Sequence, residues 1–146
     1  IMKEGIEVIK PFPGRLEIMD SSRGAIIIND SYNANPSSMR GAIDVLASMK
    51  GTKILVIGDM AELGNNTNKY HQELGDYIKT SQIDFTLAVG RHTKITMQQL
   101  DKNKFWFNSK EALLSKLLKI IDSKSIILVK GSRFMRMEEV VSKIIL

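Results

Sequence analysis

The segment Ala25-Ile26-Ile27-Ile28-Asn29-Asp30-Ser31-Tyr32-Asn33-Ala34-Asn35-Pro36 joins an apolar run to a polar turn and a helix start. The apolar run is typical of a strand buried in a sheet. Asn35 is a good helix N-cap, and proline suits the first helical position after it. An acid, a tyrosine and two asparagines therefore lie between a strand end and a helix start. Open α/β sheets bind their ligands at such places.

The rest of the chain continues the alternation of strands and helices. Met39, Ile43, Leu46 and Met49 recur at helical spacing. Short, continuously apolar runs follow, as expected of strands covered on both faces. The pattern predicts an α/β fold, a Rossmann-like three-layer domain with a mainly parallel sheet of about six strands and about five helices. The predicted strands are 15–20, 25–29, 53–57, 85–89, 105–107 and 125–130, and the predicted helices are 36–49, 67–80, 93–100, 109–121 and 137–145.

Composition limits the class of protein. The 146 residues are enough for one domain with a real core, and 43% of them are hydrophobic. No apolar run reaches the roughly 20 residues of a membrane helix, so we expect no membrane span. The absence of cysteine excludes disulfides and thiolate metal sites. The net charge of +5 suits an anionic small ligand, while scattered Lys and Arg argue against nucleic acid.

Glycine and a polar residue follow three of the predicted strands. The three pairs are Gly58-Asp59, Gly90-Arg91 and Gly131-Ser132. One alternative is that each glycine serves only a short turn, but parallel strands bring their carboxyl ends to one edge. We therefore expect one rim that carries Asp30, Asp59, Glu62, Arg91, His92, Ser132 and Arg133.

Known nucleotide and metal motifs are absent from the sequence. It holds neither a Gly-x-x-x-x-Gly-Lys-Ser/Thr loop nor a Gly-x-Gly-x-x-Gly turn. His71 and His92 lack the spacing of metal ligands, so we expect no metal site. Asn108 with Glu111 suggests a capping box at the start of the helix 109–121.

Four segments in register resemble the C-terminal domain of a Mur ligase. They are Pro13–Glu17, Asp30–Pro36, Gly58–Gly64 and Val129–Arg133. The type most resembled is the one that adds D-alanyl-D-alanine to the UDP-N-acetylmuramoyl tripeptide. By this resemblance, residues 13–146 correspond to the C-terminal domain, and residues 1–12 correspond to a linker or to the end of a preceding domain.

The resemblance implies a reaction as well as a fold. Mur ligases use ATP, with Mg²⁺, to form an acyl phosphate that an amine then attacks. Their N-terminal and central domains hold the UDP-sugar, the P-loop and the magnesium ligands, so we expect this chain alone to be inactive. We assign no catalytic residue in it with certainty. The family implies a bacterial, cytoplasmic protein of cell-wall precursor synthesis.

The resemblance also assigns nucleotide contacts to the Asp30–Pro36 segment and to Arg15. Arg15 would reach the ATP phosphates, because a guanidinium forks onto phosphate oxygens, although a surface ion pair is the alternative. Asp30 would hold the ribose, or serve only as a turn acid. Tyr32, Asn33 and Asn35 would line the cleft near the nucleotide and the acyl phosphate, and the alternative for Asn35 is that it only caps its helix.

The acceptor dipeptide is expected at the later strand ends. Arg133 is the first choice for its carboxylate, with Ser132 and Lys130 beside it and Arg91 second. The alternative for Lys130 is that it only packs in its strand. Asp59 or Glu62 would orient the ammonium group and help to remove its proton. His92 belongs to the same rim.

Two other interpretations stay open. The first is a domain of another Mur ligase or of a folylpolyglutamate synthase-like enzyme. The second is an α/β binding module without a catalytic partner. Asn33 and Asn35, which stand where those enzymes have a histidine-containing or lysine-containing version of the motif, argue against the first alternative.

Overall fold

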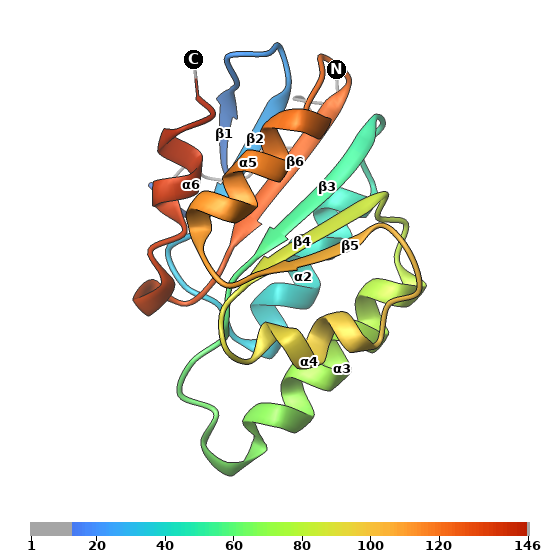
Figure 1. Cartoon of the computed structure of the whole chain (residues 1–146), viewed down its shortest axis with the longest axis vertical. Helices are drawn as coiled ribbons and strands as arrows, with labels where there is room; N and C mark the ends of the chain where they lie inside the picture. The colour runs from blue at the N-terminus through green and yellow to red at the C-terminus, as the bar shows by residue number, and fades with distance from the viewer. Residues whose placement is uncertain (1–12, 146) are drawn as a thin grey trace.

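A computed structural model describes residues 13–145, which form an α/β sandwich around one six-stranded sheet (Figure 1). The chain order of its elements follows the alternation expected of a layered α/β domain. The elements are β1 (Glu17–Asp20), β2 (Ile26–Asp30), α2 (Pro36–Ala47), β3 (Thr52–Ile57), η1 (Gly64–Asn66), α3 (Thr67–Thr80), β4 (Phe85–Val89), α4 (Thr93–Gln98), β5 (Lys104–Phe107), α5 (Lys110–Ile120), β6 (Ser125–Lys130), η2 (Arg133–Met135) and α6 (Glu138–Ser142).

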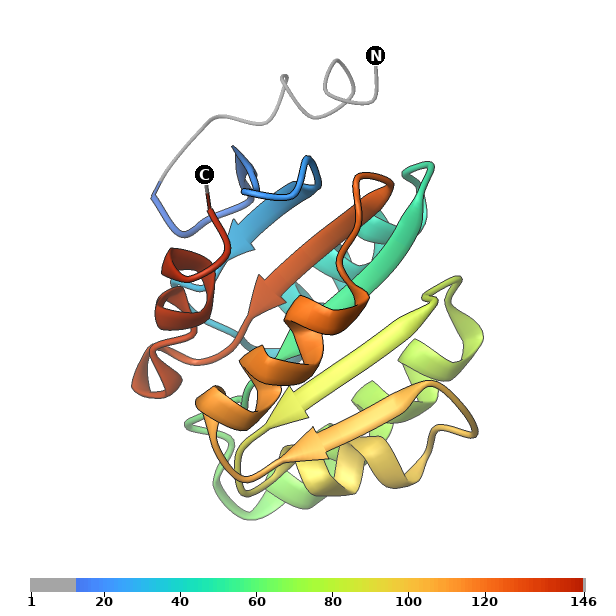
Figure 2. The ribbon, with the colours of Figure 1, turned by 45° about the horizontal axis from the view of Figure 1, so that its top comes forward.

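The sheet has the strand order β1-β2-β6-β3-β4-β5. Only β1 runs antiparallel to its neighbour, and the other pairs are parallel. The arrowheads of β2, β6, β4 and β5 point the same way in Figure 2. Because β6 lies between β2 and β3, the last strand in the sequence joins the two halves of the sheet.

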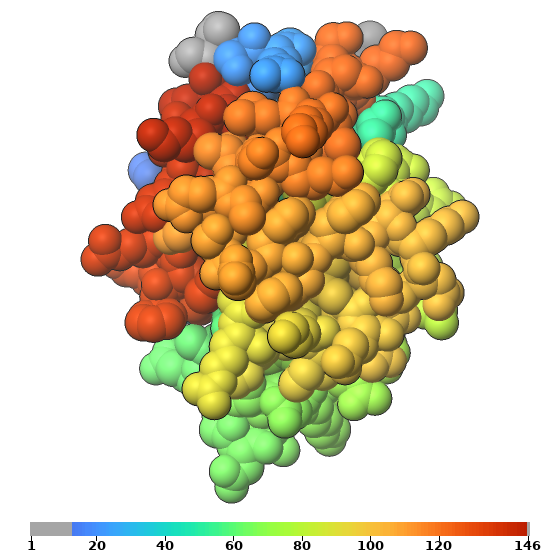
Figure 3. All heavy atoms as spheres, viewed as in Figure 1, coloured from blue at the N-terminus to red at the C-terminus, as the bar shows by residue number. Residues whose placement is uncertain are grey.

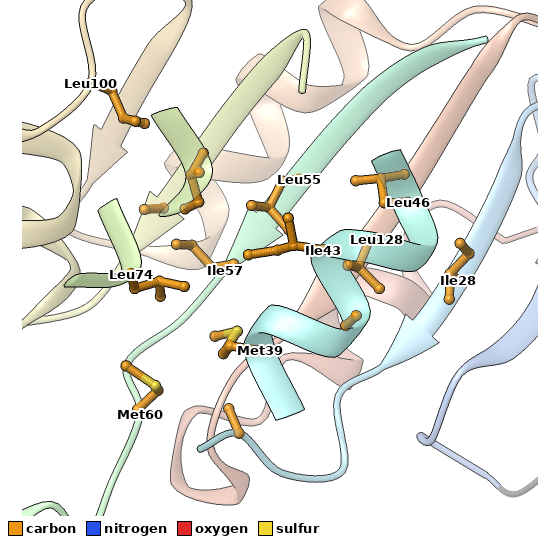
Figure 4. Close-up of a cluster of buried hydrophobic side chains, with 14 of the residues drawn as sticks. Ile28, Met39, Ile43, Leu46, Leu55, Ile57, Met60, Leu74, Leu100 and Leu128 are labelled. Atoms are coloured by element: carbon orange, nitrogen blue, oxygen red, sulfur yellow. The ribbon is translucent and has the colours of Figure 1, made fainter. Parts of the chain in front are cut away.

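Helices cover both faces of the sheet, and alternate strand residues point to opposite faces. On one face, α2, α3 and α4 pack against a cluster that includes Ile28, Leu55 and Leu128. Figure 4 shows side chains of α2 facing these strand residues. On the other face, α5 and α6 cover a cluster that includes Ile27 and Ile127. Atoms of α5 and α6 form much of the surface seen in Figure 3.

The predicted fold is confirmed: a mainly parallel sheet of six strands, with helices α2 to α6 in the described part of the chain. The bounds of α3, β4 and β6 are as predicted. The last helix is shorter than predicted. The expected segment 1–12 lies outside the described residues.

The predicted capping box of Asn108 and Glu111 is wrong. Ser109 is the N-cap of α5, and its side chain accepts a hydrogen bond from the backbone N–H of Ala112. Ser109 has an extended backbone, so its short hydroxyl reaches the first turn of the helix. At α2, a capping box does form, between Asn35 and Ser38.

Two glycines in helices differ in their surroundings and allow a matched test. A Cβ on Gly75 of α3 would lie 2.3 Å from the backbone oxygen of Thr96, whereas a Cβ on Gly41 of α2 would meet nothing within 4 Å. We expect Gly75→Ala to lower the free energy of unfolding by about 1–3 kcal/mol, because α3 and α4 must separate. Gly41→Ala should raise it by about 0.5–1 kcal/mol, because alanine favours helix. Urea unfolding of both variants checks this, and equal effects would contradict the close approach of α3 and α4.

Candidate functional site

The carboxyl ends of β2, β6, β3 and β4 form one continuous edge. Asp30, the last residue of β2, pairs with Lys130 of β6, which in turn pairs with Ile57 of β3. Ile57 pairs with Ala88 of β4. The polar residues after these strands therefore emerge side by side, as parallel pairing requires.

A cavity of about 550 Å³ opens beside the end of β2, and we call it the β2 cavity. It brings together all five residues expected to contact ATP. Lys130 lines it as well, although the sequence grouped that residue with the dipeptide. Its lining residues are Arg15, Leu16, Asp30, Tyr32, Asn33, Asn35, Ser38, Gly41, Ala42 and Lys130.

A buried ion pair forms the floor of the β2 cavity. The Nζ atom of Lys130 lies 2.8 Å from Oδ2 of Asp30, and the two residues are 3% and 7% exposed. The same Nζ donates to the backbone oxygen of Asn33 at 2.8 Å. The other carboxylate oxygen of Asp30 accepts from the backbone N–H of Leu16 at 3.1 Å. Lys130 therefore orients the Asp30–Asn33 turn.

Asn35 caps α2, which is the alternative that the sequence left open for it. Its side chain accepts from the backbone N–H of Ser38 at 2.8 Å, and the Ser38 hydroxyl accepts from the N–H of Asn35 at 3.0 Å. Asn35 is nonetheless exposed at the cavity, so its amide group remains accessible there.

A second cavity, of about 780 Å³, lies beside η2, and we call it the η2 cavity. Arg133 and Arg136 give it positive charge, while Glu17 and Glu138 give it negative charge. Tyr32 borders it as well as the β2 cavity. The lining residues are Pro13, Gly14, Glu17, Asn29, Ser31, Tyr32, Arg133, Phe134, Arg136 and Glu138.

Asp59 holds the loop that follows β4. Its carboxylate accepts three backbone N–H groups, those of Arg91, His92 and Thr93, each at 2.9 Å. Gly90 in this loop has φ +126°, and a Cβ there would lie 2.4 Å from Oδ1 of Asp59. Only glycine therefore allows this approach. Asp59 is buried and shapes the rim through the loop.

Ser132 has an unusual hydroxyl group. The residue is 2% exposed, and its Oγ has no hydrogen-bond partner within residues 13–145. Its backbone N–H donates to the carbonyl of Asp59 at 2.8 Å, which fixes its place on the rim. A buried polar atom without a partner costs free energy, so such an atom indicates a place for a ligand or water.

The other expected rim residues, Glu62 and Arg91, lie in the loops that follow β3 and β4. Arg91 is exposed and borders a third cavity, the β4 cavity, of about 530 Å³. Glu62 is exposed, and its backbone has φ +60°. Strain of that kind in a residue other than glycine occurs often at functional sites. The β4 cavity is lined by Val89, Gly90, Arg91, Trp106, Asn108, Ser109, Lys110, Glu111, Phe134 and Met135.

His71 and His92, which are far apart in sequence, meet behind the rim. Their ring centres are 5.3 Å apart. His71 is fully buried; its Nε2 accepts from the N–H of Met60 at 3.1 Å, so its Nδ1–H donates to the carbonyl of Thr67 at 2.8 Å. Burial lowers the pKa of His71 below 6.5, although the Thr67 contact raises it. Neutral His71 thus supports the loop after β3.

Sequence reasoning missed Phe134. Its side chain is 87% exposed, and it borders both the η2 and the β4 cavity. The residue follows Arg133 in a predicted loop, and the sequence carried no signal for it, because single exposed hydrophobic residues are common on protein surfaces. Within residues 13–145, no group of three or more His, Asp or Glu side chains could hold a metal, and no helix is long and apolar enough to cross a membrane.

Comparisons with known proteins agree with the geometry. Residues 14–133 match the family described as "Mur ligase, glutamate ligase domain". The UDP-N-acetylmuramoyl-tripeptide–D-alanyl-D-alanine ligase of Escherichia coli is 40% identical over 144 residues, which cover 96% of this chain and 31% of the relative. The chain thus spans about a third of the length of the curated relatives it matches.

Solved structures give the same result. MurF from Acinetobacter baumannii matches with a TM-score of 0.85 and 31% identity, over 96% of this chain and 31% of that one. The MurF ligase from Thermotoga maritima in complex with ADP matches with a TM-score of 0.82 and 26% identity, over 92% of this chain and 31% of that one.

Removal of Lys130 should be costly, because it leaves the carboxylate of Asp30 buried without its partner. We expect Lys130→Met to lower the free energy of unfolding by about 3–5 kcal/mol. Lys79→Met is the matched control, since the Lys79–Asp101 pair is exposed and should contribute less than about 1 kcal/mol. Chemical denaturation measures both, and equal losses would contradict a buried pair. The double variant Lys130→Met/Asp30→Asn should recover part of the loss.

The lowered pKa of His71 makes stability depend on pH. The unfolded chain takes up this proton near pH 6.5, whereas the folded chain resists it until a lower pH. Stability should therefore be full above pH 6.5 and fall as the pH decreases, by at most about 1.4 kcal/mol per pH unit, until His71 is protonated in the folded state too. His71→Gln should lose this part of the dependence in denaturation curves from pH 7.5 to 5. An unchanged slope in the variant would assign the dependence to other groups.

Proposed function

Since the chain belongs to the Mur ligase family, we propose that it is the C-terminal domain of the ligase that joins D-alanyl-D-alanine to the UDP-N-acetylmuramoyl tripeptide with ATP. This is a cytoplasmic step of bacterial peptidoglycan precursor synthesis. One observation carries the proposal. The β2 cavity and the Ser132–Arg133 loop are neighbours on one sheet edge, so a nucleotide and an acceptor can meet there.

The nucleotide would bind in the β2 cavity. A carboxylate that accepts hydroxyl protons is a natural partner for a ribose, and each oxygen of Asp30 can accept a further hydrogen bond. Arg15 would contact the phosphates, and Tyr32, Asn33 and Asn35 would line the space around them. Lys130 would support this half of the site, because its Nζ binds Asp30 and the carbonyl of Asn33.

The dipeptide would bind where the loops after β6 and β3 meet. Arg133 would pair with its carboxylate, with the hydroxyl of Ser132 beside it and Arg91 as a second cation. Of the two acids expected at the ammonium group, Glu62 is exposed, whereas Asp59 already accepts three N–H groups. Glu62 would therefore face the ammonium, and Asp59 and His92 would shape the rim.

The reaction proceeds in two displacements. The tripeptide carboxylate attacks the γ-phosphorus of ATP, and ADP leaves. The dipeptide nitrogen, after loss of a proton, attacks the acyl carbon, and phosphate leaves from the tetrahedral intermediate. The other domains would supply the P-loop, Mg²⁺ and the UDP-sugar site, so the chain alone should be inactive. Closure onto ATP would keep water from the acyl phosphate.

An activity assay of the full-length enzyme tests the proposed reaction. ADP formation should require the UDP-sugar tripeptide together with D-alanyl-D-alanine, and L-alanyl-L-alanine should not replace it. An amide NMR titration of this chain locates the sites. ADP should shift residues that line the β2 cavity, and the D-dipeptide should shift 59–63, 90–92 and 130–133. Equal shifts with both dipeptides would contradict the acceptor site.

Substitution of Ser132 tests whether its hydroxyl binds the acceptor dipeptide or only supports the structure. Ser132→Ala removes a buried Oγ that has no partner within residues 13–145, so the free energy of unfolding should not fall. The KM for D-alanyl-D-alanine should rise about two- to tenfold, as for a lost hydrogen bond. Ser109→Ala, which removes the cap of α5, should lower stability by about 1 kcal/mol and leave that KM unchanged. An unchanged KM in Ser132→Ala would remove this residue from the acceptor site.

A further inference from the structure

Tyr32 stands between the two larger cavities. It lines the β2 cavity, where the nucleotide is proposed, and also the η2 cavity, which Arg133 borders. Its side chain is half-buried, so the ring is both supported by the protein and accessible. A residue in this place can affect ligand binding in both the β2 cavity and the η2 cavity.

Two guanidinium groups rest on the ring of Tyr32. The Cζ atom of Arg15 lies 4.2 Å from the ring centre, and that of Arg133 lies 4.7 Å from it. Both distances are within the range of cation–π attraction. The two arginines come from opposite ends of the described chain, one before β1 and one in η2. Both arginine side chains are exposed, and an exposed arginine has many rotamers, so contact with an aromatic ring restricts its position.

The backbone fixes Tyr32 itself. Its N–H donates to the carbonyl of Gly14 at 2.8 Å, in the segment just before Arg15. Asp30, two residues earlier, is held by Lys130 and by the N–H of Leu16. The ring is thus carried by a segment with buried anchors, whereas the two guanidinium groups are at the surface.

We propose that Tyr32 is a positioning residue for Arg133, and hence for the carboxylate of the acceptor dipeptide, as well as for Arg15 on the nucleotide side. The inference rests on the proposed function and extends it, because the sequence assigned Tyr32 to the cleft near the nucleotide and the acyl phosphate and not to the acceptor dipeptide. The aromatic ring is what matters, because the cation–π attraction needs no hydroxyl.

Steady-state kinetics of the full-length enzyme test the role of the ring. Tyr32→Leu should raise the KM for D-alanyl-D-alanine about two- to fivefold, the value of one or two exposed cation–π contacts. Tyr32→Phe should keep that KM within about twofold of the wild type, since phenylalanine retains the ring. Tyr70→Leu, which changes a half-buried tyrosine of α3, is the matched control and should leave it unchanged.

A double-mutant cycle tests whether Tyr32 acts through Arg133. Arg133→Met should raise the KM for the dipeptide about tenfold or more, as for the loss of a charged hydrogen bond. In the Arg133→Met background, Tyr32→Leu should add no further increase, because the group that it positions is gone. Effects that multiply, or a Tyr32→Phe variant as impaired as Tyr32→Leu, would overturn the inference.

An NMR measurement tests the geometry without any ligand. In the 146-residue chain, the side-chain Hδ resonances of Arg15 and Arg133 should be shifted upfield by the ring of Tyr32. Tyr32→Leu should abolish both shifts, and Tyr32→Phe should keep them. Absence of these shifts in the wild type would overturn the inference, whatever the kinetics of the variants show. Failure of the proposed function would be seen separately, as a wild-type enzyme whose ADP formation does not depend on the dipeptide.

Discussion

The buried pair of Lys130 and Asp30 joins the ends of β2 and β6, two neighbouring strands of the sheet that are far apart in the sequence. Strand β6 inserts between β2 and β3, and its last residue binds the last residue of β2 at 2.8 Å. Two buried charges are costly to desolvate, and they are tolerated because each also has a backbone partner, Asn33 for the lysine and Leu16 for the acid. The turn that begins at Asp30 and the floor of the β2 cavity depend on this contact.

Buried polar groups shape the neighbouring half of the rim in a similar way. Asp59 accepts hydrogen bonds from three N–H groups of the loop after β4, and His71 accepts one from the N–H of Met60 after β3. These side chains are held by the backbone and are not at the surface. The residues that remain for a ligand are the exposed ones that these loops carry. A site whose loops are fixed before binding loses less conformational entropy when a ligand arrives.

The exposed part of the rim is rich in arginine. Arg15 and Arg133 meet at Tyr32, Arg136 borders the η2 cavity, and Arg91 borders the β4 cavity. Phosphates and carboxylates are the groups that guanidinium binds best. The ligands of a peptide-forming ATP-dependent ligase carry both, and this agrees with the family to which the chain belongs. Composition alone assigned the positive net charge to anionic ligands in general, and these four arginines lie where such ligands can bind.

The sequence by itself determined the order and type of the elements and the strand exits that form the site. Apolar runs, glycines at strand ends and helical spacing of apolar residues are local signals, so the strands β4 and β6 and the helix α3 have the predicted bounds. The five residues expected at the nucleotide do line one cavity. Only the tertiary structure decided which rim residues hold the backbone and which remain exposed. It paired Lys130 with Asp30 across 100 residues of chain, used Asp59 to hold a loop, and brought His71 beside His92. Such pairings depend on the order of strands in the sheet, and a local pattern does not encode that order, because any parallel arrangement of the same strands would satisfy it.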